Sequence, residues 1–233
     1  MKRVDLYFAI IAVSSLTLSS APCSACTHPI ETARSYLAEQ YHFERENEKI
    51  LALSETGLRE PEWSALKEFF PTEQFYYFHT SFPSRKYALI VVFSDCRTVV
   101  LDGIVAVENM LELAPPQLRN PDQAAEYAQL LLRMLNVSGV YGQGYKDGVN
   151  MIRRTEDITF SDSEERAQLE ETLNILEPSL HLKDGGFSYT FNSWNRKGNG
   201  NVYRTTLTYT PPAKLSLDRK LVAPGVGAWE PAR

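Results

Sequence analysis

The chain has 233 residues and a formal net charge of -5 at pH 7. Its apolar fraction of 43% and aromatic fraction of 11% are those of a globular protein with a sizeable core, which excludes global disorder. Its 24 basic residues are scattered among 29 acidic ones, so no basic stripe is available to bind phosphates. We therefore expect neither nucleic acid nor an anionic membrane surface as a partner.

The N-terminus has the pattern of a cleavable secretory signal peptide, residues 1–25. Two basic residues open it, an apolar run spans 6–18, and small residues follow. Signal peptidase requires small side chains one and three residues before the cut, and Ala25 and Cys23 meet that requirement if cleavage precedes Cys26. The apolar run is shorter than the roughly 20 residues of a membrane span. We expect a secreted or periplasmic mature chain, 26–233, without a transmembrane segment.

Cleavage at this point leaves the mature chain with two cysteines, Cys26 and Cys96. In an oxidising compartment this pair predicts a disulfide that closes a loop of about 70 residues and stabilises the fold by about 4 kcal/mol. Two alternatives stay open. In the first, Cys26 is the lipidated first residue of an envelope lipoprotein, although such sites usually have Leu where this chain has Cys23. In the second, the cysteines are free buried thiols.

The first half of the mature chain predicts a helix followed by strands. The helix spans Pro29 to Glu48, with Thr27 or His28 as its cap, and a shorter helix over 62–70 ends before Pro71. Alternating and β-branched residues then predict four strands, Phe75 to Phe82, Tyr87 to Phe93, Thr98 to Leu101 and Ile104 to Val107. The second of these strands is apolar on both faces, so we place it in the middle of a sheet.

The pair Asp102-Gly103 decides how the last two strands are connected. Asp-Gly between two β-branched runs is typical of a type I′ hairpin turn, in which both central residues have positive φ. Alternatively, a helix begins at Gly103 and ends at 114–116, because the residues from Glu108 to Leu113 are good helix formers.

The second half predicts helices and then strands again. The helices are Pro121 to Leu135 and Ser163 to Glu177, with one strand around Val149 to Arg153 between them. The strands Phe187 to Trp194 and Val202 to Tyr209 follow, joined by a turn at 198–201, and Leu215, Leu217 and Leu221 continue into a third. The sequence therefore predicts a single α+β domain, with an antiparallel sheet (a meander plus a C-terminal hairpin) packed against three or four helices.

Few residues have the spacing of a catalytic or metal site. No histidine pair has the spacing of a helical zinc site, no nucleophile elbow is present, and the glycines at 142–148 miss the dinucleotide-binding pattern, so we expect no cofactor or metal. One compact set of reactive groups comprises Asp95 and Asp102 with Cys96 and His79. Two carboxylates in one cleft would supply general acid and base chemistry, but both aspartates also suit turns.

Aromatic residues supply the candidate binding surfaces. Tyr141 and Tyr145 offer rigid contact area in a glycine-rich loop, and the aromatic run 75–78 would line a groove with Trp194 and Tyr203. We predict a non-catalytic binding or accessory protein whose partner is another extracytoplasmic protein. The alternatives are an extracytoplasmic hydrolase that uses acids of the central sheet, and the lipoprotein anchored at Cys26.

Overall fold

The computed structural model describes residues 26–43, 48–53, 63, 65–80, 87–116, 118, 121–137, 150–158, 175–195 and 200–226. The described elements of the first half are α1 (Pro29–Tyr41), β1 (Glu48–Ala52), α3 (Leu66–Phe69), β2 (Gln74–Thr80), β3 (Tyr87–Val92), β4 (Thr98–Val100) and α4 (Ile104–Leu113). Those of the second half are α5 (Pro121–Val137), β5 (Asn150–Ile152), the 3-10 turn Thr155–Asp157, β6 (Ser179–Lys183), β7 (Gly186–Trp194), β8 (Val202–Thr210) and β9 (Lys214–Ala223).

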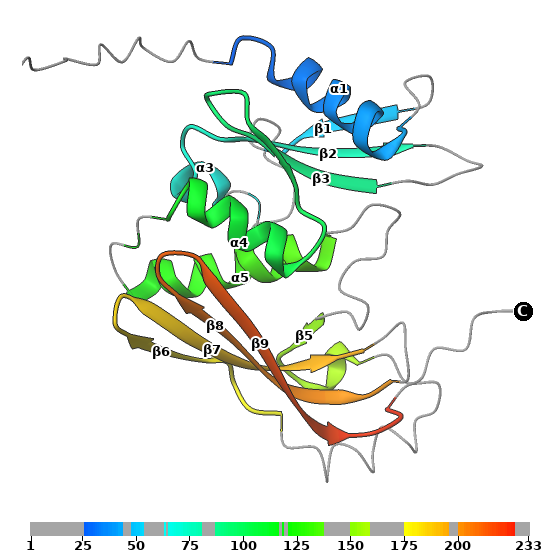
Figure 1. Cartoon of the computed structure of the whole chain (residues 1–233). Coiled ribbons are helices and arrows are strands. Elements are labelled where there is room, and N and C mark those ends of the chain that lie inside the picture. Colours follow the sequence, from blue (N-terminus) through cyan, green and yellow to red (C-terminus); the bar gives the residue numbers. More distant parts are fainter. Residues whose placement is uncertain are drawn as a thin grey trace, which may run out of the picture.

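The strands form two separate antiparallel sheets with helices between them. Sheet A is the meander β1-β2-β3-β4, and sheet B has the order β5-β7-β8-β9, with β6 pairing to β7 beside β5. Figure 1 shows the layers: α1 covers one face of sheet A, the helices α3, α4 and α5 lie between the sheets, and sheet B closes the other side. The predicted α+β class is confirmed, with two sheets in place of one.

Sheet A is covered on both faces, as the apolar run of β3 predicts. β3 lies between β2 and β4, with Ile90 opposite Val100 and Tyr76. These three residues pack against α1, whereas Leu89 and Val91 point to the opposite face and enter the main core. A central strand buried on both faces needs apolar residues at every position, and that is what the sequence provides.

Helix α5 fills the space between the two sheets. An amphipathic surface helix buries one stripe, but α5 is buried on nearly all sides over its second half, and its residues join the same core as the inner faces of both sheets. The buried residues are Ala124, Tyr127, Ala128, Leu130, Leu131, Leu132, Met134 and Leu135. Ala124, Ala128, Leu131 and Leu135 form one buried stripe at helical spacing, and the other buried residues form a second face.

The predicted hairpin at Asp102-Gly103 is wrong, because α4 begins there. Gly103 is the residue before the helix, and its φ of 162° is extended backbone, outside the left-handed region that a type I′ turn needs at both central residues. The alternative helix, ending near Ala114, is the one observed. The same dipeptide at Asp184-Gly185 does form the tight connection between β6 and β7, with φ of 50° and 76°.

The end of the first predicted helix also needs correction. The helix ends at Tyr41 because His42 adopts a left-handed conformation and its N–H bonds to the Leu37 carbonyl. Residues from Glu48 onward then pair with β2 as β1. Their charged side chains favour a helix locally, but strand pairing overrides that preference.

The remaining expectations divide between confirmed and undescribed segments. The short helix before Pro71 and the strands β5, β7, β8 and β9 match the predicted segments, while β6 was not predicted. The expected helix Ser163 to Glu177 lies mostly outside the described residues, and its last residues, 175–177, are not helical. The first two residues of the 198–201 turn also lie outside them.

Tyr127 offers a test of the core, because its buried hydroxyl has no hydrogen-bond partner among the described residues. Its ring contacts Phe187 and Tyr209, and burial raises its pKa. The Tyr209 hydroxyl, in contrast, donates to the Pro212 carbonyl at 2.9 Å. Removing an unpaired buried hydroxyl relieves a desolvation cost, whereas removing a bonded one loses roughly 1 kcal/mol.

We therefore predict that Tyr127→Phe leaves the free energy of unfolding unchanged or raises it by about 1 kcal/mol, while the matched variant Tyr209→Phe lowers it by about the same amount. Urea denaturation measures both. An equal loss of stability in the two variants would contradict this account of the core.

Candidate functional site

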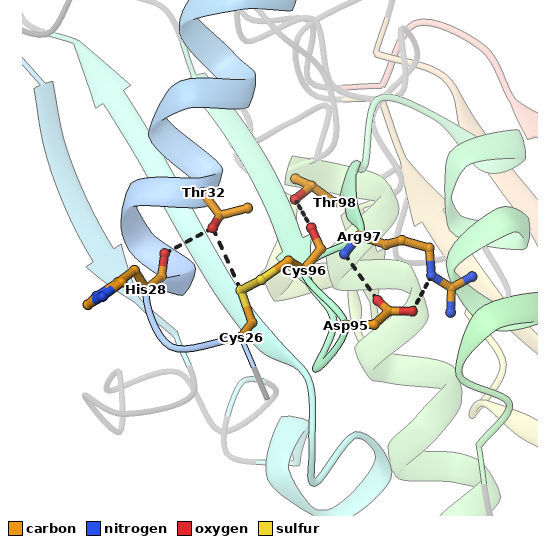
Figure 2. The surroundings of a disulfide bond; sticks show 7 residues. All are labelled: Cys26, His28, Thr32, Asp95, Cys96, Arg97 and Thr98. Carbon is orange, nitrogen blue, oxygen red and sulfur yellow. Dashed lines mark hydrogen bonds and ion pairs between the residues drawn. A yellow bond between two sulfur atoms is a disulfide. The ribbon is translucent and has the colours of Figure 1, made fainter. Parts of the chain in front are cut away.

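A disulfide ties the start of the described chain to sheet A. Cys26 and Cys96 are bonded, with Cα atoms 5.0 Å apart, and the Cys26 N–H donates to the Ser94 carbonyl at 2.7 Å. Figure 2 shows that the bond joins the segment before α1 to the turn between β3 and β4. A lipid anchor would need the same Cys26 sulfur, so the bond and the anchor exclude each other. Within the described ranges, no helix is long and apolar enough to cross a membrane.

Asp95 stabilises the turn that carries the disulfide. Its carboxylate accepts hydrogen bonds from the Arg97 N–H at 3.0 Å and from the Arg97 Nε at 2.6 Å, as drawn in Figure 2. These interactions lower the pKa of Asp95, the backbone N–H contributing most. Cys96, between them, has a φ of 66°. Asp95 therefore has the geometry of a turn residue.

The other two members of the reactive set lie apart from Asp95 and from each other. Asp102 follows β4, at the opposite end of the β3–β4 hairpin from Asp95, on the face where α1 packs. There it accepts a hydrogen bond from Tyr41, whose pKa is raised by burial and by this carboxylate. His79 lies on the other face, where its ring stacks with Tyr87 and lies beside Tyr77. The structure does not bring the three groups into one cleft.

The aromatic binding candidates are also separated. Trp194 is buried in a small core and donates from Nε1 to the Val226 carbonyl at 2.9 Å. Tyr203 lies opposite Ser193, so it points to the other face of sheet B from Trp194. Its hydroxyl accepts a bond from the Asn201 side chain at 3.0 Å, and the Arg219 guanidinium lies over its ring. Tyr141 and Tyr145 lie outside the described residues.

A shallow groove of about 490 Å³ lies beside the disulfide, between α1 and the start of β4. Its walls are polar and come from Glu31, Thr32, Ser35, Tyr36, Glu39, Cys96 and Thr98. The Glu31 carboxylate already pairs with Arg34. None of the candidate catalytic residues Asp95, Asp102 and His79 lines this groove.

The strongest binding feature is the outer edge of β9, which forms one margin of sheet B (Figure 1). β9 pairs with β8 on one side, and no described strand pairs with its other side. The orientation of its backbone follows from Leu215, whose N–H points away from β8 and donates to the Glu108 carboxylate of α4 at 2.8 Å. In an antiparallel strand this orientation repeats every second residue. The N–H and C=O groups of Leu217, Arg219 and Leu221 therefore also face away from β8, up to the register shift between the pairs Tyr203–Leu221 and Val202–Ala223.

Glu108 covers only the beginning of this edge. Its carboxylate accepts from Leu215 and pairs with Lys214 at 3.0 Å. Burial acts to raise the pKa of Glu108, but these two partners lower it, so the carboxylate is ionised at neutral pH. Beyond Leu215, burial falls along β9, and Leu221 is 50% and Val222 45% exposed. The open part of the edge therefore carries exposed apolar side chains.

Comparison with protein-family models, with curated proteins and with solved structures yields no match. The site therefore rests on the geometry of the chain itself. The leucine alternation of β9 predicted a strand, but its position at the margin of the sheet was missed. The lysines at 214 and 220 are the sequence signal that could have indicated it, because edge strands often carry Lys.

The disulfide gives a direct test of how the N-terminal segment is held. We predict that Cys96→Ser lowers the free energy of unfolding by about 4 kcal/mol, because the unfolded chain regains the freedom of a long loop. Cys26→Ser should cost the same, and the double variant no more than either single one. Urea denaturation measures all three, and intact mass without reductant should show two hydrogens fewer than the reduced chain. Additive losses or an acyl mass would contradict the bond.

Proposed function

We propose that the protein is an exported, non-catalytic binding protein that adds an extended strand of a protein partner to the free edge of β9. The observation that carries this proposal is the outward-facing backbone of Leu217 and Leu221. In strand addition, unpaired main-chain groups of a sheet edge bind an extended peptide, and side-chain contacts give specificity. The partner is expected to be another extracytoplasmic protein.

Two further features support the proposal. The signal-peptide pattern of residues 1–25 and the Cys26–Cys96 bond both fit an oxidising, extracytoplasmic compartment. The candidate acids fit structural roles better than catalytic ones, since Asp95 bonds within its own turn and Asp102 bonds to Tyr41. A hydrolase would need these groups to converge on one substrate atom.

A pair of proline variants separates binding at the edge from folding of the sheet. Proline removes the backbone N–H, which is tolerated on an edge strand where that N–H faces outward. Leu221→Pro removes an outward N–H and should preserve the thermal midpoint while abolishing partner capture. Lys220→Pro removes an N–H that faces β8 and should lower the thermal midpoint. Differential scanning calorimetry measures stability, and pull-down from the native cell envelope and culture medium, read by mass spectrometry, measures capture.

The expected result is one stoichiometric protein partner that the wild-type protein retains and the Leu221→Pro variant loses. Equal capture by both proteins would place the binding site elsewhere and contradict the proposal. Capture of no protein by a folded, monodisperse wild-type sample would also contradict the proposal.

A further inference from the structure

The side chains around the free edge indicate what kind of segment it accepts, if the proposed strand addition holds. We infer that the added strand carries an acidic residue opposite Lys220 and, next to it, an apolar residue opposite Leu221. This inference rests on the proposed function and specifies the partner of the same site.

The acidic preference follows from two like charges that face each other across the last pair of strands. Arg204 of β8 lies directly opposite Lys220 of β9, an arrangement that destabilises a sheet. Arg204 is held in place by the Asn192 side chain at 3.0 Å and the Leu176 carbonyl. Among the described residues, no ion pair joins a carboxylate to either cation, although Asp218 lies two residues from Lys220. A carboxylate on the open side of Lys220 would offset this repulsion.

The geometry of the edge places such a carboxylate close to Lys220. Because the Lys220 backbone faces β8, this residue would form a non-hydrogen-bonded pair with the incoming strand. In such pairs the Cα atoms are about 4.5 Å apart and the side chains approach most closely. Leu221 points to the opposite face of the sheet and is 50% exposed. An apolar neighbour on the incoming strand would cover it.

A yeast-displayed library of random ten-residue peptides tests the inference. Peptides are selected on the wild-type mature protein and counter-selected on the Leu221→Pro variant, so that only edge binders survive. We expect enrichment of Asp or Glu at one position beside an apolar residue. On Lys220→Glu as bait, the same position should change to Lys or Arg. Lys183→Glu, at the far end of β6, is the matched control and should leave the selection unchanged.

Synthetic versions of one enriched peptide, with Glu or Gln at that position, then give dissociation constants. The Glu peptide should lose roughly fivefold in affinity on Lys220→Glu, as expected for reversal of a cross-strand charge pair, whereas the Gln peptide should change little. Edge binders without the acidic preference would overturn this inference and leave strand addition standing. No enrichment for the wild type over Leu221→Pro would overturn both.

Discussion

The burial of α5 between two sheets is the constraint on which the rest of the structure depends. The inner faces of sheets A and B are apolar, and neither can be left in water. The helix meets both through residues such as Tyr127 and Leu131, which belong to one continuous core. Since α4 and α5 fill the middle layer, each sheet keeps its own outer face. Helix α1 covers the outer face of sheet A. In sheet B, the edge strand β9 extends beyond the helical layer.

The position of the open edge follows from this arrangement. The beginning of β9 lies beside α4, where Glu108 satisfies the Leu215 N–H and Lys214 together. The rest of the strand extends past the helices, so Leu217 is partly buried and Leu221 is exposed. The edge is therefore open at the end away from the helical layer, which is where the exposed apolar and charged residues lie.

Much of this fold could be predicted from local patterns. The apolar run of β3, the stripe of α5 and the alternation of β7 reflect short-range periodicity, and cysteine parity predicted the disulfide. The two Asp-Gly pairs show where such reasoning fails. Asp184-Gly185 makes the tight connection, whereas Asp102-Gly103 precedes a helix, because packing of α4 against α5 and β9 decides the conformation there.

The candidate site could not be predicted for a related reason. Whether a strand lies at the centre or the margin of a sheet depends on pairing between distant segments, and alternation along β9 is the same in both cases. Similarly, sequence proximity grouped Asp95, Asp102 and His79. The two aspartates, however, lie at opposite ends of the β3–β4 hairpin, and Asp102 and His79 lie on opposite faces of sheet A. Order along the chain does not specify which face or end a residue occupies.

The central claim is that one side of β9 is open to another strand, and amide hydrogen exchange of single residues tests it most directly. If the account is correct, NMR-detected exchange will be fast at Leu217 and Leu221, whose N–H groups face away from β8. Exchange will be slow at Asp218 and Lys220, whose N–H groups bond to β8. Equal protection at all four amides would show that the edge is already paired or covered, and would contradict the account.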